Sequence, residues 1–131
     1  MSNKKILVVE DDADVRLGYR VLLKAHDYDT FFAADSVAAV SEARKQHPDL
    51  ILLDLGLPAG DGFIVLERFK ANTMLQMIPV VVVSARDPHQ NKERALKAGA
   101  RAYLQKPWND DELLETIRSL LGEHPPVPQH Q

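Results

Sequence analysis

Short apolar segments recur along the chain, and most of them end on polar residues. The segments are continuous rather than alternating and rich in β-branched side chains, which is typical of strands buried on both faces of a parallel sheet. We predict strands over residues 6–9, 28–33, 50–53, 80–83 and 102–105.

The stretches between these strands carry apolar residues at spacings of three or four, which indicates amphipathic helices. A first helix follows Asp11, and its predicted inner face holds Val15, Gly18, Tyr19, Leu22 and Ala25. A second helix is capped by Asp35 or Ser36, and its predicted inner residues are Val37, Val40 and Ala43. A third opens at Asp61–Gly62 and carries Phe63, Leu66 and Phe69.

The last two helices have clear end signals. Asp87 is the expected N-cap before Pro88, and the helix that follows, to Ala98, has so few apolar residues that we expect it to pack lightly. Gly99 is its expected left-handed C-cap. The final helix begins at Asn109 and stops at Gly122; its predicted buried residues are Leu113, Ile117, Leu120 and Leu121.

A strand followed by a helix, five times over, predicts an α/β fold with a doubly wound parallel five-stranded sheet and helices on both faces. We expect one domain over residues 1–122, because 131 residues suffice for one domain only. Residues 123–131 contain three prolines in nine positions, which predicts a flexible Pro-rich tail or the start of a linker.

Composition narrows the functional classes. The absence of cysteine excludes disulfides, thiolate catalysis and cysteine-based zinc sites. A net charge of −3 gives no electrostatic footprint for direct nucleic-acid binding. The apolar runs are too short to cross a membrane, and no signal peptide precedes the first strand, so we expect a cytoplasmic protein.

The polar residues at the strand ends are the candidate site. They are Glu10, Asp11, Asp54, Ser84 and Lys106. In an open parallel sheet, ligands bind at the carboxyl ends of the strands, so we expect these side chains to converge. Clustered carboxylates repel one another unless a cation joins them, and oxygen ligands alone suit Mg²⁺. A carboxylate such as Asp54 can attack phosphorus and form an acyl phosphate.

Each of these residues also has an ordinary structural interpretation. Asp54 can be a helix cap or turn residue, Glu10–Asp11 can cap the first helix, and Lys106 can be a solvated lysine. Ser84 can simply end its strand, and Tyr103 can be a partly exposed ring on an edge strand. The Lys106–Pro107 bond can be cis, which would aim the lysine back into the crevice. It is their joint occurrence at four strand ends that favours a site.

The sequence resembles the receiver domain of two-component response regulators over residues 4–122. Three motifs carry the resemblance: Ile-Leu-Val-Val-Glu-Asp-Asp at 6–12, Pro-Asp-Leu-Ile-Leu-Leu-Asp-Leu-Gly-Leu-Pro at 48–58 with Asp-Gly at 61–62, and Ala-Gly-Ala-Arg-Ala-Tyr-Leu-Gln-Lys-Pro-Trp at 98–108. The resemblance implies a flavodoxin-like sheet with the strand order 2-1-3-4-5.

The resemblance also implies a role for each site residue. Asp54 is the implied phospho-acceptor, with Lys106 pairing the phosphoryl group and Ser84 turning its hydroxyl toward it. Tyr103 is the implied aromatic switch coupled to Ser84. The implied Mg²⁺ ligands are Asp11, Asp54 and the backbone carbonyl of Gly56, with Glu10 acting through water.

The implied function is a phosphorylation-controlled switch. A sensor histidine kinase or phosphotransfer protein donates the phosphoryl group, and the face made by the fourth helix, fifth strand and fifth helix then controls an output that the sequence does not name. The chain departs from common receiver patterns in several places. Gly56 offers no side chain to orient an attacking water, Arg86 occupies a second position that tunes dephosphorylation, and Trp108 is expected on the signalling face.

Other functions compete with the switch. A Mg²⁺-dependent aspartyl phosphatase needs a second aspartate two residues after the nucleophile, where this chain has Gly56. A flavodoxin-like cofactor binder needs a phosphate loop after the first strand, where Glu10 and Asp11 repel phosphate. A phosphorylation-independent, protein-binding receiver is expected to lack Asp54 or Lys106, and both are present.

Overall fold

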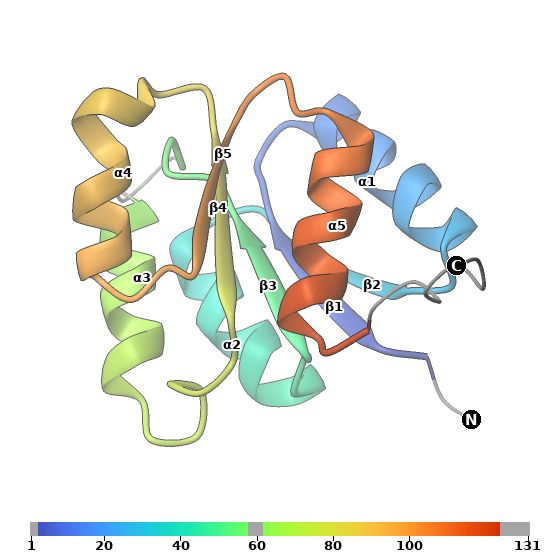
Figure 1. Ribbon diagram of the computed structural model, residues 1–131. Helices are drawn as coiled ribbons and strands as arrows, with labels where there is room; N and C mark the ends of the chain where they lie inside the picture. The colour runs from blue at the N-terminus through green and yellow to red at the C-terminus, as the bar shows by residue number, and fades with distance from the viewer. Residues whose placement is uncertain (1–2, 58–61, 124–131) are drawn as a thin grey trace, which may run out of the picture.

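A parallel sheet of five strands runs through the middle of the molecule (Figure 1). The computed structural model describes residues 3–57 and 62–123. The strand order β2-β1-β3-β4-β5 confirms the predicted doubly wound, flavodoxin-like sheet. The strands are β1 (Lys5–Val9), β2 (Asp29–Ala33), β3 (Leu50–Leu53), β4 (Val80–Ser84) and β5 (Ala102–Gln105).

Helices cover both faces of this sheet. Helices α1 and α5 lie on one face, and α2, α3 and α4 lie on the other (Figure 1). Each face therefore has its own hydrophobic core, which explains why the strands are apolar at successive positions instead of alternating. The helices are α1 (Ala13–Ala25), α2 (Ser36–Gln46), α3 (Gly62–Ala71), α4 (Pro88–Lys97) and α5 (Asp110–Leu120).

The ends of the helices follow the capping chemistry of their sequences. The carboxylate of Asp35 accepts a hydrogen bond from the amide of Ala38, and that of Asp87 accepts one from His89. The side chain of Asn109 accepts one from Glu112. These caps satisfy amides that have no partner inside the helix, which is typically worth about 1 kcal/mol each. Both Asp87 and Asn109 are as predicted.

The core differs from the predicted one on two helices. In α1, Gly18 and Ala25 are exposed, and the buried residues are Tyr19 and Leu23. In α2, Val37 is 72% exposed, whereas Ala39 and Ala43 are fully buried. Small side chains line the inner face of α2 because it packs closely against β1, β2 and α3. A spacing of three or four identifies a face but does not tell which of two overlapping faces packs inward.

The last two helices match their predicted character. Ala95 is the buried residue of α4, and Leu96 is 40% exposed, so this helix packs lightly. In α5, Leu113 and Ile117 are fully buried, and Leu114 joins them although it was not predicted. Leu120 and Leu121 are only partly buried at the end of the helix.

Two predictions concern residues that the structure does not describe. Asp61, the predicted start of the third helix, and residues 124–131 of the predicted tail lie outside the described residues. Within the part that the structure describes, no helix has the length and apolar character needed to cross a membrane.

Candidate functional site

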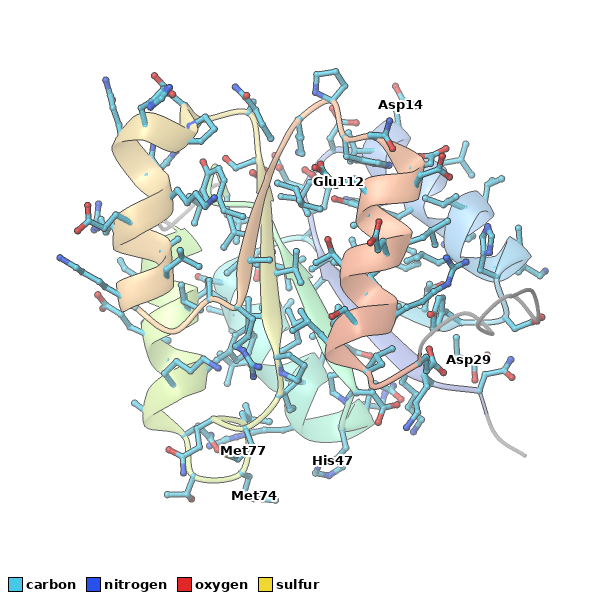
Figure 2. The ribbon with its side chains drawn as sticks, viewed as in Figure 1. Asp14, Asp29, His47, Met74, Met77 and Glu112 are labelled. Carbon is cyan, nitrogen blue, oxygen red and sulfur yellow. The ribbon has the colours of Figure 1, made fainter. Side chains whose placement is uncertain are left out.

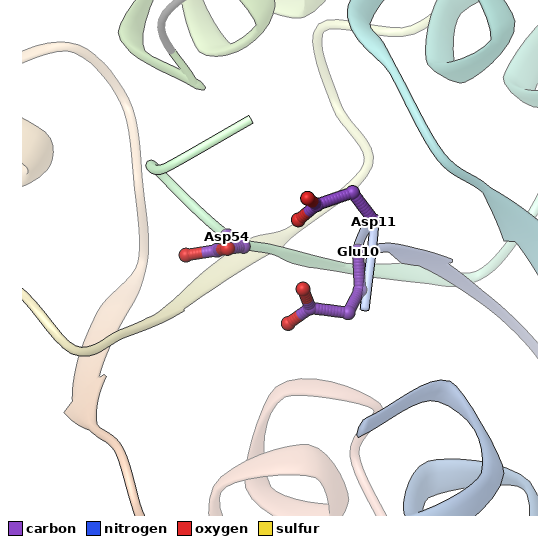
Figure 3. Close-up of side chains that lie close together, drawn as sticks. All are labelled: Glu10, Asp11 and Asp54. Atoms are coloured by element: carbon purple, nitrogen blue, oxygen red, sulfur yellow. The ribbon is translucent and has the colours of Figure 1, made fainter. Parts of the chain in front are cut away.

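The register of the sheet brings the acidic residues together. Val9 of β1 is paired with Leu53 of β3, so Glu10 and Asp54 leave neighbouring strands at the same level. The amide of Asp54 donates to the carbonyl of Val9 over 3.0 Å, which continues the pairing by one residue. Carboxylate oxygens of Glu10, Asp11 and Asp54 lie within 4.8 Å of one another (Figure 3). The three carboxylates therefore converge at the edge of the sheet, as we expected from the sequence.

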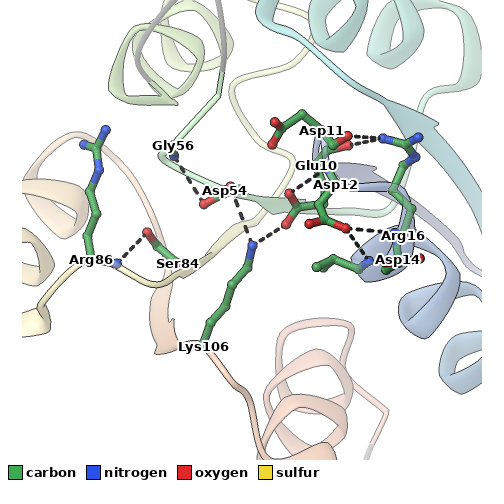
Figure 4. A network of polar contacts seen from close by, with 11 residues as sticks. Glu10, Asp11, Asp12, Asp14, Arg16, Asp54, Gly56, Ser84, Arg86 and Lys106 are labelled. Atoms are coloured by element: carbon green, nitrogen blue, oxygen red, sulfur yellow. Dashed lines mark hydrogen bonds and ion pairs between the residues drawn. The ribbon is translucent and has the colours of Figure 1, made fainter.

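Lys106 directly follows β5, the strand at the edge of the sheet, and its side chain extends to this cluster. Its ammonium group bonds Oε1 of Glu10 and lies 3.6 Å from Oδ2 of Asp54 (Figure 4). The backbone amide of Lys106 donates to the carbonyl of Ser84 over 2.8 Å, which ties the end of β5 to the end of β4. The Lys106–Pro107 peptide bond is cis. The lysine is thus a member of the site and not a solvated surface residue.

Glu10 is held in an unusual environment for a carboxylate. Its side chain is 2% exposed, and burial raises its pKa above the ordinary value. The negative charge of Asp54 also raises the pKa, while hydrogen bonds from Lys106 and from the amide of Asp12 lower it. Removing these charges from water is costly, and pairing with the Lys106 ammonium group offsets part of that cost.

The loop between β1 and α1 is braced by two residues that sequence reasoning missed. Asp12 caps α1 by accepting from the amides of Asp14 and Val15. Nη1 of Arg16 donates to the carbonyls of Glu10 (2.9 Å) and Asp11 (2.8 Å), as Figure 4 shows. Arg16 therefore fixes the backbone that carries both acids. Its position one turn after Asp12, in the first turn of the helix, is the only sequence signal for this role.

The loop after Asp54 comes close to the carboxylate. The amide of Gly56 donates to Oδ1 of Asp54 over 3.2 Å. A Cβ atom at Gly62 would lie 2.6 Å from the carbonyl oxygen of Asp54 and 2.5 Å from Cα of Leu55. Only glycine fits at position 62, because the start of α3 packs directly on the backbone of the strand end.

Ser84 and Tyr103 lie at the ends of the two adjacent strands. Ser84 is 1% exposed, and its Oγ accepts from the amide of Arg86 over 3.1 Å. Tyr103 is 8% exposed, so its ring is buried and not partly exposed, and its hydroxyl donates to the carbonyl of Arg86 over 2.9 Å. Burial raises the pKa of Tyr103, and its hydrogen bond with Ser84 opposes this effect. Both side chains thus meet at the segment that leads into α4.

Trp108 lies elsewhere than predicted. Its ring stacks on Tyr19 of α1, with the ring centroids 4.2 Å apart and an angle of 8° between the planes. It is half-buried against the core beneath α1 and α5. The prediction that Trp108 lies at the surface of the signalling face is therefore wrong, because the turn after Pro107 carries the ring toward α1.

The donor set fits a hard divalent cation. Among the residues that the structure describes, three carboxylates of the cluster face the ammonium group of Lys106, which leaves an excess of negative charge. Glu10 and Asp54 are buried, whereas Asp11 is exposed and leaves the cluster open to solvent. Oxygen donors of this kind suit Mg²⁺, which retains several waters when bound to proteins.

Figure 2 shows the two ends of the molecule. Asp14 and Glu112, in the first turns of α1 and α5, lie at one end, and Asp29, His47, Met74 and Met77 lie at the other.

Comparison with known protein families agrees with this site. Residues 6–118 match the family described as the response regulator receiver domain. The chain belongs to this family. It is a receiver domain of two-component signal transduction.

Two curated response regulators are similar to this chain over most of its length. The polar-differentiation response regulator DivK of Brucella ovis is 36% identical over 120 residues, which cover 92% of this chain and 98% of DivK. The phosphate regulon transcriptional regulatory protein PhoB of Escherichia coli is 35% identical over 124 residues, covering 95% of this chain. This chain spans only about half (54%) of PhoB.

Solved structures share the fold closely. A putative response regulator from Chloroflexus aurantiacus has a TM-score of 0.88 at 26% identity, covering 93% of this chain and 100% of that one. The receiver domain of sensor histidine kinase PA1611 from Pseudomonas aeruginosa has a TM-score of 0.84 at 28% identity, with the same coverage. That structure contains a magnesium ion coordinated in the active site cleft.

Proposed function

We propose that residues 1–122 form a receiver that accepts a phosphoryl group on Asp54. The observation that carries this proposal is the position of Lys106, whose ammonium group lies between Glu10 and Asp54 at the carboxyl edge of the sheet. A cation at this place can pair first with the carboxylates and then with a phosphoryl oxygen. The donor is a sensor histidine kinase or a phosphotransfer protein.

The chemistry is a nucleophilic displacement at phosphorus. A carboxylate oxygen of Asp54 attacks the phosphorus of a phosphohistidine, an O–P bond forms, and the P–N bond to the imidazole breaks. The imidazole leaves with its electron pair and takes up a proton. The product is an acyl phosphate on Asp54, and later attack by water returns the carboxylate and releases inorganic phosphate.

The residues around Asp54 supply the electrostatics of this step. The transition state spreads negative charge over the phosphoryl oxygens, so positioned cations contribute most of the stabilisation. Asp11, Asp54 and the Gly56 carbonyl would hold Mg²⁺, with Glu10 acting through water. When bound, the ion neutralises the phosphoryl charge. Lys106 neutralises a second oxygen, and Arg16 holds the β1–α1 loop in place.

The phosphoryl group acts as a switch through Ser84 and Tyr103. The Ser84 hydroxyl turns from the Arg86 amide toward a phosphoryl oxygen when Asp54 is phosphorylated. Tyr103 contacts the same Arg86 segment, so a shift of this segment reaches the ring and α4. The surface formed by α4, β5 and α5 then changes its affinity for an output domain or protein.

Turnover of external substrates is not part of this proposal. An aspartyl phosphatase needs an acid two residues after its nucleophile, and position 56 is glycine. The chemistry proposed here is limited to Mg²⁺-dependent self-phosphorylation and autodephosphorylation of Asp54.

The test is incubation with Mg²⁺ and acetyl phosphate, followed by intact-mass measurement. We expect the mass of one phosphoryl group on the wild type, none on Asp54→Ala, and one on the control Asp14→Ala, which alters an exposed carboxylate at the same end of the molecule. An unchanged wild-type mass, or labelling of Asp54→Ala, would overturn the assignment of Asp54.

A further inference from the structure

The stacked rings of Tyr19 and Trp108 join the first helix to the loop that carries Lys106. We propose that this stack is a positioning pair, which holds the β5–α5 loop so that the Lys106 ammonium group points at the phosphoryl site. The proposal rests on the role of Lys106 in the proposed function. Tyr19 and Trp108 act through Lys106 and do not touch the phosphoryl group themselves.

The loop is anchored at both ends, and the stack lies between the two anchors. At one end, the amide of Lys106 donates to the carbonyl of Ser84. At the other, Asn109 caps α5. Between them, Trp108 lies flat on Tyr19, and its indole N–H donates to Oδ1 of Asp110 over 2.9 Å. The indole is therefore fixed both in its plane and in its rotation, two residues from the lysine.

Tyr19 is held firmly in the core, so the ring on which Trp108 stacks has a fixed position. Tyr19 is 2% exposed in the middle of α1, packed in the core formed with β1, β3 and α5. Its pKa is raised by burial and then by the charges of Glu10 and Asp54, so its hydroxyl stays neutral and lies within the field of the acidic site. The ring thus connects the helix that begins at the acidic loop with the loop that delivers the cation.

Lys106 needs such support because its side chain is long and flexible. Its ammonium group must satisfy two carboxylates and then a phosphoryl group, and small misplacements of reacting groups have large effects. Lys106 and Trp108 also line one hollow of about 540 Å³, together with Val15, Ala85, Pro107 and Asp110. A missing indole would widen this hollow and give the lysine room to swing into solvent.

The test compares variants that remove the stack with variants that keep an aromatic ring. Tyr19→Leu and Trp108→Leu should weaken binding of the phosphoryl mimic beryllofluoride at saturating Mg²⁺ by roughly two- to tenfold, the size of a lost aromatic pair. Tyr19→Phe and Trp108→Phe should bind it within twofold of wild type. Calorimetry should still detect Mg²⁺ binding by all four variants, because the carboxylates themselves are unchanged.

A double-mutant cycle separates positioning from general packing. In the Lys106→Ala background, Tyr19→Leu and Trp108→Leu should cause no further loss of beryllofluoride binding, because the residue through which they act is gone. An equal loss in both backgrounds, or wild-type binding by both leucine variants, would overturn the proposal. Trp108 is half-buried, so Trp108→Leu keeps the test available if Tyr19→Leu does not fold.

A spectroscopic measurement keeps this inference distinct from the proposed function. The Cε carbon of Lys106 should shift in the NMR spectra of the leucine variants and return toward its wild-type position in the phenylalanine variants. If wild type accepts neither phosphoryl nor beryllofluoride, the proposed function fails while this measurement still tests the positioning. An unchanged Lys106 signal in both leucine variants would refute the positioning alone.

Discussion

A Cβ atom on residue 56 would lie 3.7 Å from Oδ2 and 3.9 Å from Oδ1 of Asp54. Gly56 is exposed, so this space opens to solvent directly beside the proposed phosphoryl acceptor. A polar side chain introduced there would lie beside a phosphoryl group on Asp54 and close to the water that attacks it. We therefore expect the residue at position 56 to influence how long a phosphoryl group survives on Asp54.

We expect Gly56→Asn to shorten the phosphoryl lifetime. The added amide can hydrogen-bond and orient an attacking water, an effect worth up to about 10²-fold for a well-positioned group. Loss of the phosphoryl mass with time, after removal of acetyl phosphate, measures the rate. Gly18→Asn is the control, because a side chain at this exposed helical position meets nothing within 4 Å. A lifetime that is unchanged or longer in Gly56→Asn would contradict the expectation.

Asp11→Asn should bind Mg²⁺ at least about tenfold more weakly than wild type, because it removes one of three clustered ligand charges. Isothermal calorimetry without any phosphodonor gives both affinities. Asp14→Asn removes the same charge three residues further along, outside the cluster, and should bind the ion almost as wild type does. Equal losses in the two variants would mean that bulk charge, and not ligation by Asp11, sets the affinity.

Helix α4 should be the least protected helix in hydrogen exchange. It buries only Ala95, whereas α3 buries Phe63, Leu66 and Phe69 among others. Few apolar anchors lower the free energy of local opening. One additional contact ties α4 to α3, since the guanidinium of Arg94 lies 3.7 Å from the ring centroid of Phe63.

Arg94→Gln should therefore reduce the protection of α4 further and leave α1 unchanged. Phosphorylation of the wild type should raise the protection of α4 by favouring one of its packings. Exchange in α4 as slow as in α3 before phosphorylation would speak against a mobile switch surface.

Tyr28→Phe should lower the free energy of unfolding by about 1 kcal/mol near neutral pH. The Tyr28 hydroxyl donates to Oε1 of Glu123 over 2.9 Å, which ties the segment after α5 to the start of β2. Urea denaturation of both proteins measures the difference. Glu42→Gln, which alters a partly buried carboxylate of α2 that accepts a hydrogen bond from Gln46, offers a control with little expected effect.

Tyr28 should also make the free energy of unfolding depend on pH. Burial, and then the hydrogen bond and charge of Glu123, raise the pKa of Tyr28 from 10.0 to about 12. The folded state thus favours the neutral phenol. The resulting stabilisation is complete below pH 10 and disappears as the pH rises from 10 to about 12. The stability difference between wild type and Tyr28→Phe should shrink over this interval, and a constant difference would show that the phenol titrates normally.

Much of the fold could be predicted from local pattern alone. Runs such as 50–53 and 80–83 have no polar residue on either face, and only strands covered on both sides satisfy that. Because parallel strands end at a common edge, the residues directly after them had to meet, which placed Glu10, Asp11, Asp54 and Lys106 in one site. Helix caps such as Asp87 could also be predicted from the sequence, since their hydrogen bonds span only two or three residues.

Tertiary packing decided what these local signals leave open. Whether Val37 or Ala39 faces the sheet depends on how closely α2 approaches its neighbours, and the smaller residue fits. The placement of Trp108 on Tyr19 joins residues that no periodicity relates. Arg16 binds two carbonyls that become available only once β1 ends and α1 begins. The sequence determines which side chains reach the edge of the sheet, and packing between distant segments determines how firmly each one is held there.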